Sequence, residues 1–488
     1  MNWVLNFFIE RRNISVKKLI NRYSMFYILV LACICCSSCS VKKEHDLIND
    51  QNYKVEQEKE QVIPQEDLSD KNIQDNSENT SDIKTKIEED DLPAENYGNK
   101  NNLSKDFLQN FYDFTEQTFA HIIRDNEGKN QIYAPFNFYL SLSMLNELSE
   151  GEAREEIQKA LNISDAKNNA SELNTALSSL QERRLFPIGR LNINTSLWLS
   201  DEINYKDNLL NMLQSQYNTE IFKGDLKDRE FQNLMTKWVY ENTNFEFQPD
   251  YQSDYHKSFD QLDQHTFISL STLDFYDEWL NPFNEEDTKP DTFFISDNEK
   301  ITCDFMNMEA WSHPFMVGED YISTIFILKG GAEYMLFILP KEGLSVDELV
   351  EEKGKLAEII YNWTDGQVSD GKISVGKVKL SIPKFAYEDE IDLRKTAEKM
   401  GIRKIFDINS KAFSLFADED TYITDIRQVS KIEINEKGCS ASSYTEIAAV
   451  GAVASKDEAE VILNRPFIYI LYKDKIPFLA GVVRNPLG

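Results

Sequence analysis

The sequence predicts an α+β domain, because apolar segments with helical spacing and short β-branched or aromatic runs are interspersed without regular strand–helix–strand alternation. Hydrophobic residues make up 41% of the chain and aromatic residues 12%, which is enough for a substantial core. Near the C-terminus, about twenty small residues separate two predicted strands, and so long a loop inside a compact domain is commonly functional or disordered. The fold class is therefore α+β with one unusual loop.

The N-terminus has the pattern of an export signal. Basic residues precede an apolar core at 25–32 that is too short for a membrane span of about twenty residues. Small residues and cysteines follow, and the pattern resembles a bacterial lipoprotein signal, in which the cysteine after the cleavage point takes up lipid. We expect lipid on Cys39, with Cys33 as the alternative; an ordinary secretory signal or an uncleaved anchor is the other alternative. Residues 1–39 are thus assigned to a lipoprotein-type signal of an exported, membrane-anchored protein at the cell surface or in the periplasm, or otherwise of a secreted one.

Residues 40–102 are predicted to form a disordered acidic tether. The segment is rich in Asp, Glu, Asn, Gln and Lys and has no sustained period, so it cannot bury enough apolar surface to offset the entropy of ordering. The net charge of −31 argues against nucleic acid, or an anionic membrane surface, as a charge-driven partner. Only Cys303 and Cys439 lie beyond this tether, so no disulfide framework is implied.

Residues 103–488 form the predicted folded body. Phenylalanines at helical spacing indicate a first helix over 103–124, and two further helices are predicted at 138–148 and 151–161. Strands are predicted, in order, at 193–199, 266–275, 322–328, 334–339, 376–382, 431–434, 461–463 and 467–471, with a final hairpin strand at 478–483.

The long loop alternates in character. From Cys439 on, every second residue is small or apolar, as at Ala441, Ser443 and Thr445, whereas Tyr444 and Glu446 fall in the other set. Since alternate residues of a strand face opposite sides, the loop could become a strand with a small-residue face turned inward. Period alone leaves a surface linker as an equal alternative.

Enzyme motifs are missing from the sequence: it contains no HExxH, GxSxG or Walker loop, and no CxxC outside the signal region. We therefore expect no catalytic activity, no metal and no cofactor. His256 and His265 lie near several aspartates, but a polar loop explains them better than a site.

A set of motifs in fixed order carries a family resemblance. Those around the loop are Asn435-Glu436-Lys437-Gly438, Asn464-Arg465-Pro466-Phe467 and Gly481-Val482-Val483-Arg484-Asn485-Pro486. Those upstream include Ile132-Tyr133-Ala134-Pro135, Gly151-Glu152-Ala153-Arg154, Lys237-Trp238-Val239, Phe337-Ile338-Leu339-Pro340 and Ile382-Pro383-Lys384-Phe385. Together they resemble the serpins (serine protease inhibitors) over residues 103–488.

The resemblance implies three β-sheets, about eight or nine helices, and an exposed reactive-centre loop at about 437–460. Serpins are a known case of loop insertion into a sheet: a serine protease, or alternatively a cysteine protease, cuts the loop and is trapped as an acyl-enzyme. This implies a monomeric suicide inhibitor; a non-inhibitory surface binding protein is the alternative.

The reactive bond follows from the resemblance by counting from the hinge glycine. Fourteen residues after Gly438 lies Ala452, with Val453 on the leaving side. The small side chains before this bond suit an elastase-like or subtilisin-like protease. Lys456 is the alternative, for a trypsin-like enzyme.

The resemblance also assigns a hinge and a sheet-opening region. The hinge comprises Glu436, Gly438, Cys439, Ala441, Ser443 and Thr445, and the sheet-opening region comprises Ala134, Asn137, Ser271, Gln428 and Trp279. Cys439 stands where the family usually has Thr or Ser, and Tyr444 is bulky for an inserting segment. The polar cluster of the family is usually Ser, Ser, Asn and His, so Ala134 and Gln428 imply a repacked network; plain core variation is the alternative.

Overall fold

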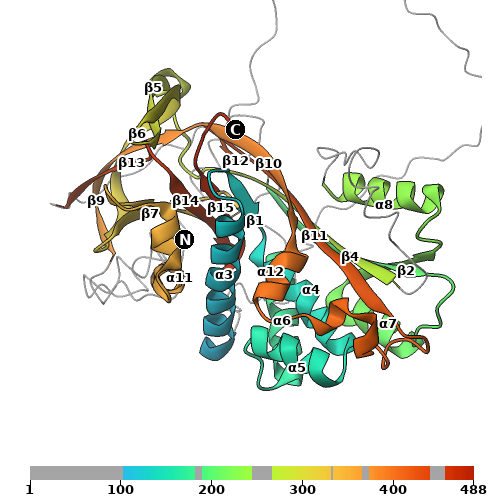
Figure 1. Cartoon of the computed structure of the whole chain (residues 1–488). Helices are drawn as coiled ribbons and strands as arrows, with labels where there is room; N and C mark the ends of the chain where they lie inside the picture. The colour runs from blue at the N-terminus through green and yellow to red at the C-terminus, as the bar shows by residue number, and fades with distance from the viewer. Residues whose placement is uncertain (1–102, 182–188, 244–265, 331–332, 365–372, 440–456) are drawn as a thin grey trace, which may run out of the picture. The chain divides into compact units, whose positions relative to one another are not determined.

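A computed structural model describes residues 103–181, 189–243, 266–330, 333–364, 373–439 and 457–488 (Figure 1). The predicted signal and tether, with Cys33 and Cys39, lie outside these residues, as do His256 and His265. In the part described, no helix is long and apolar enough to cross a membrane.

Nine α-helices belong to the described residues. They are α3 (Lys105–Asp125), α4 (Pro135–Leu148), α5 (Gly151–Ala160), α6 (Ala166–Gln181), α7 (Asp207–Tyr217), α8 (Arg229–Asn242), α10 (Val346–Glu351), α11 (Lys355–Thr364) and α12 (Leu393–Lys399). Ser104 precedes the first of these helices, and its hydroxyl accepts a hydrogen bond from the Phe107 amide and so caps the helix. Its phenylalanine face is buried, as the spacing predicts.

The strands, in chain order, are β1 (Gln131–Tyr133), β2 (Arg190–Ser200), β3 (Thr219–Gly224), β4 (Thr266–Glu278), β5 (Lys289–Ser296), β6 (Glu299–Val317), β7 (Tyr321–Ile327), β8 (Glu333–Pro340), β9 (Ser374–Pro383), β10 (Phe385–Asp392), β11 (Tyr422–Asn435), β12 (Gly438–Cys439), β13 (Glu458–Ile462), β14 (Phe467–Lys473) and β15 (Ile476–Val483). Helices and strands alternate irregularly along the chain, so the α+β class is confirmed.

The central sheet has the strand order β10-β11-β12-β4-β2-β3. The other strands form one network, β1-β15-β14-β8-β7-β6-β9-β13, with β5 also paired to β6. The long β6 shifts register between Ala310 and His313, where Ser312 has a positive φ of 57°. β6 pairs with β5 before the bulge, at 299–305, and with β7 after it, at 315–317, whereas its ladder with β9 continues on both sides. The network divides into two sheets along β6, so the fold has three sheets in all.

The strand prediction missed β1, β3, β5, β6 and β10 and covered only the end of β11. The pattern over β6 does not predict a strand, because the bulge interrupts its alternation and both faces are partly covered. For β11 only the last residues, 431–434, were predicted. Its earlier part carries buried polar side chains such as Gln428 and Ser430, which weaken the apolar signal of a strand.

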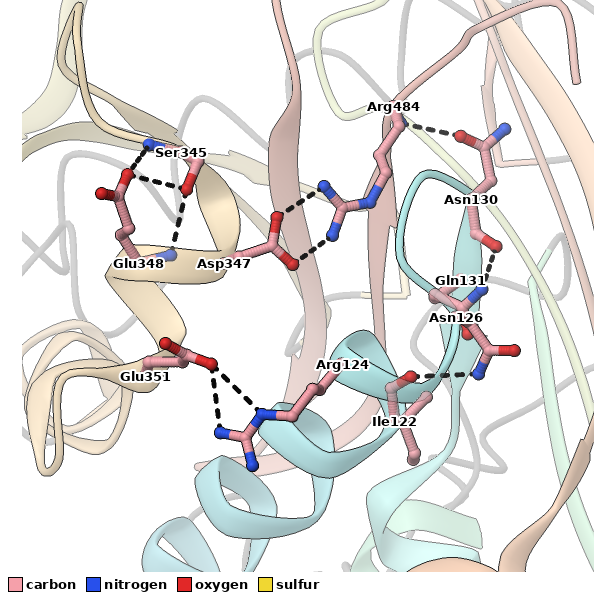
Figure 2. Close-up of polar contacts among 10 residues, drawn as sticks. All are labelled: Ile122, Arg124, Asn126, Asn130, Gln131, Ser345, Asp347, Glu348, Glu351 and Arg484. Carbon is pink, nitrogen blue, oxygen red and sulfur yellow. Dashed lines mark hydrogen bonds and ion pairs between the residues drawn. The ribbon is translucent and has the colours of Figure 1, made fainter.

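The C-terminal segment is held by side-chain contacts from two other parts of the chain (Figure 2). Arg484 makes a two-pronged ion pair with Asp347 in α10, at 2.8 and 2.7 Å. The side-chain oxygen of Asn130 accepts hydrogen bonds from the amides of Arg484 and Asn485. These contacts fix the end of the chain beside β1 and α10.

Candidate functional site

The hinge enters the central sheet as a strand of two residues, β12. On one side, Cys439 is opposite Ile434 and Gly438 is opposite Asn435 of β11. On the other side, the same two residues are opposite Asp277 and Glu278 at the end of β4. Both ladders are antiparallel, so β12 is the start of a strand placed between β4 and β11 (Figure 1).

Only glycine fits at position 438. A Cβ there would collide with the Asp277 carbonyl and come within 2.6 Å of the Glu278 Cα, which are backbone atoms that cannot give way. Its φ of 153° is also one that side-chain-bearing residues rarely adopt. The hinge glycine is therefore required by the close approach of β12 to β4.

Cys439 is buried, with 2% of its surface exposed. Its sulfur lies 3.9 Å from the Met335 sulfur of β8, on the side of the sheet that faces the core. Burial, and then the neighbouring Asp277, raise the pKa of the Cys439 thiol well above its usual value. While it is docked in this way, the thiol is an unreactive apolar side chain.

Glu436 anchors the chain just before β12. Its carboxylate accepts a hydrogen bond from the Thr288 hydroxyl at 2.8 Å and pairs with Lys384 at 3.1 Å. Burial alone would raise the pKa of Glu436, but the hydrogen bonds from its own backbone, Thr288 and Lys384 outweigh it and lower that pKa. The backbone carbonyl of Glu436 also accepts from the Phe283 amide.

Below β12 the two central strands part. The parallel pairing of β11 with β4 ends at Val429 opposite Thr272, several residues short of Cys439. Between these points lies a cavity of about 30 Å³ lined by the facing residues of the two strands, by Thr243 and by Cys439 itself. The next residues after Cys439 would meet this cavity if the strand continued.

Asn137 marks the point where the strands part. Its side-chain amide, at the start of α4, donates to the Thr272 carbonyl at 3.0 Å. Thr272 is the last residue of β4 paired with β11, so this bond supplies its carbonyl with a buried donor.

The other predicted sheet-opening residues lie in two places. Ser271 and Gln428 are directly opposite each other in β4 and β11, and Gln428 donates to the Ser430 hydroxyl at 2.9 Å. Ala134 is fully buried just before α4. The side-chain oxygens of Asn137 and Gln428 have no hydrogen-bond partner among the described residues.

Trp279 lies eight residues further along than Ser271, beside the hinge. Its indole N–H donates to the Asn435 carbonyl at 2.9 Å, and its amide donates to the Lys437 carbonyl, also at 2.9 Å. The ring is fully buried and packs against Phe283 and Phe326. Trp279 therefore stabilises the turn before β12 and lies away from the point where β4 and β11 separate.

Sequence reasoning missed a buried ion pair at this end of β4. Lys329 lies 2.6 Å from the Glu278 carboxylate, and neither side chain is more than 6% exposed. Tyr276 also donates to Glu278, at 3.1 Å, and the Lys329 amide donates to the Glu278 carbonyl at 2.9 Å. The partners are 51 residues apart, and no local pattern links them.

The rest of the predicted site lies outside the described residues. This applies to the hinge positions Ala441, Ser443 and Thr445, to Tyr444, and to the reactive-bond candidates Ala452, Val453 and Lys456. Among the described residues, no group of three or more His, Cys, Asp or Glu side chains could hold a metal ion.

Comparisons with known proteins agree over most of the chain. Residues 109–486 match the family model described as "Serpin (serine protease inhibitor)". Plasminogen activator inhibitor 1 of Bos taurus is 26% identical over 377 residues, covering 74% of this chain and 87% of the relative. Antichymotrypsin-2 of Bombyx mori is 23% identical over 387 residues and covers 78% of this chain and 98% of the relative.

Solved structures share the fold. The thermophilic serpin tengpin in its native state superposes with a TM-score of 0.68 at 22% identity, covering 79% of this chain and 95% of tengpin. Human thyroxine-binding globulin superposes with a TM-score of 0.66 at 20% identity, covering 78% and 99%. With the ordered motifs, the three sheets and the family match together, the chain belongs to the serpin family.

Proposed function

We propose that this serpin is a suicide-substrate inhibitor of serine proteases with elastase-like or subtilisin-like specificity. The observation that carries the proposal is the position of Gly438 and Cys439 as the first two residues of a strand between β4 and β11. Directly beyond them, the pairing of β4 with β11 is already interrupted. The hinge is thus placed to guide the residues that follow into the sheet.

In the proposed mechanism the protease does the chemistry. Its serine attacks the Ala452 carbonyl, the bond to Val453 breaks, and the Ala452 side remains attached as an acyl-enzyme. The freed segment then enters between β4 and β11 and carries the protease with it. About a dozen new ladder hydrogen bonds at roughly 1 kcal/mol each would supply on the order of 10 kcal/mol.

That energy is sufficient to disable the enzyme. Misplacing a catalytic group by about 1 Å can cost on the order of a hundredfold in rate. Distortion of the triad and oxyanion hole therefore strands the acyl-enzyme before water can hydrolyse it. The inhibitor needs no catalytic residue of its own.

Incubation with pancreatic elastase and with subtilisin tests the proposal. We expect an SDS-resistant covalent complex and a rise in the thermal stability of the cleaved inhibitor. Clean cleavage with neither adduct nor stabilisation would rule the inhibitory mechanism out. Mass spectrometry of the released peptide decides between cleavage after Ala452 and after Lys456.

A matched pair of loop variants tests insertion itself. Thr445→Arg puts a charge on the proposed inward face, so it should convert inhibition into substrate-like cleavage. Glu446→Arg puts the same group on the opposite face and should retain inhibition. Equal inhibition by both variants would show that the assignment of faces is wrong.

The second candidate is a non-inhibitory binding protein. It is favoured by the likeness of the fold to thyroxine-binding globulin, whose structure contains thyroxine. Bulky Tyr444 in the hinge segment points the same way. The elastase incubation separates the two candidates, because a binding protein would be cleaved without forming an adduct.

We further propose that the mature protein is a monomer anchored to a membrane by lipid on Cys39, or alternatively on Cys33. The support is the sequence pattern alone. Mass spectrometry of the N-terminal peptide from membrane-extracted protein should show a lipid-modified cysteine. Cys39→Ala should release the protein from the membrane, and a variant that remains anchored through Cys33 would establish the alternative site.

A further inference from the structure

One exposed face of three adjacent strands, β6, β9 and β13, carries charged side chains. Lys377 pairs with Glu309, and Lys379 lies 3.6 Å from Glu460. In the parallel ladder, Glu458 is opposite Lys377 and Glu460 is opposite Lys379. The intervening residues Val378, Leu380 and Val461 are fully buried on the opposite face. This charged face belongs to the sheet that the chain joins immediately after the reactive loop.

Trp311 interrupts the charged face with a large apolar ring. Its side chain is 58% exposed, although a tryptophan in a globular protein is usually highly buried. The Lys377 ammonium lies 5.0 Å from the ring centroid, within range of a cation–π contact. Lys377 thus holds both the Glu309 carboxylate and the indole on the exposed side.

The register of β6 with β9 shows how the ring is positioned. Ala310 is opposite Val378 and His313 is opposite Gly376, so Trp311 and Ser312 together face the single residue Lys377. Ser312 takes a positive φ of 57°, which allows the extra residue to fit. Trp311 follows Glu309 by two residues, so strand alternation already puts its indole on the exposed face, opposite Lys377. The bulge comes directly after it, and the ladder resumes with His313 opposite Gly376.

The ring lies close to the point where the loop rejoins the fold. The Lys377 amide donates to the Asp457 carbonyl at 2.9 Å, and a Cβ on Gly376 would collide with that carbonyl. Trp311 is two strands from β13, a separation of about 10 Å. Val453 precedes Asp457 by four residues, which span at most about 14 Å. A protease that holds the reactive bond is therefore kept within reach of this face.

We propose that Trp311, with Lys377 and the carboxylates of Glu309, Glu458 and Glu460, forms a secondary docking surface for the body of the target serine protease. This rests on the proposed function. A standard interface buries about 800 Å² per partner, a patch of roughly 16 Å radius, which extends well beyond an active-site cleft. Tryptophan is the residue type most enriched among the side chains that dominate binding energy. The surrounding ion pairs form a polar rim whose excess of carboxylates favours a basic patch on the protease.

The test separates docking from trapping. Pancreatic elastase whose serine nucleophile is replaced by alanine binds without forming an acyl-enzyme, so its Kd reports docking alone. We expect Trp311→Ala to raise this Kd, and to lower the second-order rate constant for inhibition of active elastase, by about 30-fold. The stoichiometry of inhibition should stay unchanged, because insertion follows docking.

Leu415→Ala is the matched control. Leu415 is an exposed apolar side chain, 43% accessible, that lies before the start of β11, at the end of that strand remote from the hinge. Its removal should leave both constants unchanged. Trp311→Gln gives a second variant with a polar chain, and thermal unfolding confirms that both Trp311 variants are folded.

Four outcomes decide the question. A rise in Kd and a fall in the rate constant that are specific to the Trp311 variants support the docking surface. If wild type and Trp311→Ala have the same Kd and the same rate constant, the docking surface is overturned. A covalent adduct formed in that case would still support the inhibitory function. Trp311-dependent binding without any adduct supports docking and refutes inhibition. Failure of wild type to bind the inactive elastase overturns the docking surface.

Discussion

Glu278 and Lys329 form a buried ion pair directly under the docked hinge. Their charged atoms are 2.6 Å apart, and Glu278 is also the β4 residue opposite Gly438. A buried pair is not in itself a large source of stability, but removing one partner leaves an uncompensated charge in the protein interior. The end of β4, and with it the place of the hinge, therefore depends on both residues.

Lys329→Met should lower the free energy of unfolding by about 3–5 kcal/mol, because Glu278 loses its cation. The double variant Lys329→Met/Glu278→Leu should recover most of that loss. Urea unfolding measures both. As a control, Arg124→Ala breaks the exposed pair with Glu351 (Figure 2) and should cost no more than about 1 kcal/mol. Equal losses for the buried and the exposed pair would contradict this account.

Gly438→Ala should displace β12 from the sheet, since the added Cβ would collide with the backbone of β4. The Cys439 thiol, buried in the wild type, would then become accessible. We expect its alkylation rate to rise at least tenfold, read by mass spectrometry on the peptide that contains Cys439. Gly343→Ala is the control; it substitutes a glycine that also has positive φ, 88°, but meets no other atom within 4 Å. An unchanged rate would mean that β12 does not depend on the glycine.

Asn137→Ala should destabilise the native protein by about 1–3 kcal/mol, because the buried Thr272 carbonyl loses its donor. Asn168→Ala, which removes only an exposed contact with Glu172, should change stability by less than about 0.5 kcal/mol. Thermal unfolding of the two variants compares them directly. If the Asn137 variant were as stable as the control, the hydrogen bond from Asn137 to Thr272 would not contribute to stability.

His313 should make stability depend on pH. Burial lowers its pKa from the ordinary 6.5 to about 4, so between these values the unfolded chain binds more protons than the native one. The contribution of neutral His313 to the free energy of unfolding is fully present above pH 6.5. It decreases by about 3 kcal/mol in all as the pH falls toward 4. His313→Gln should flatten this part of the urea-midpoint profile, and matching slopes for both proteins would contradict the assignment.

The sequence by itself determined the fold class, the family and the position of the loop. These follow from local and ordered signals: helical spacing of phenylalanines, alternating strands, and motifs at the hinge and the C-terminus.

Only the tertiary structure decided how the hinge is held. The sequence alone allows Gly438 and Cys439 to be the base of a loop. Their place in the sheet depends on Glu278 and Asp277 of β4, which lie 160 and 162 residues earlier in the sequence. The Glu278–Lys329 pair and the bond from Asn137 to the Thr272 carbonyl also depend on the tertiary structure. Their partners are far apart in the sequence, so no periodic sequence pattern links them. Trp311 shows the limit most clearly. A tryptophan in the sequence predicts a core residue, and only the pairing of β6 with β9 shows that its ring lies on the exposed face, beside the Lys377 ammonium.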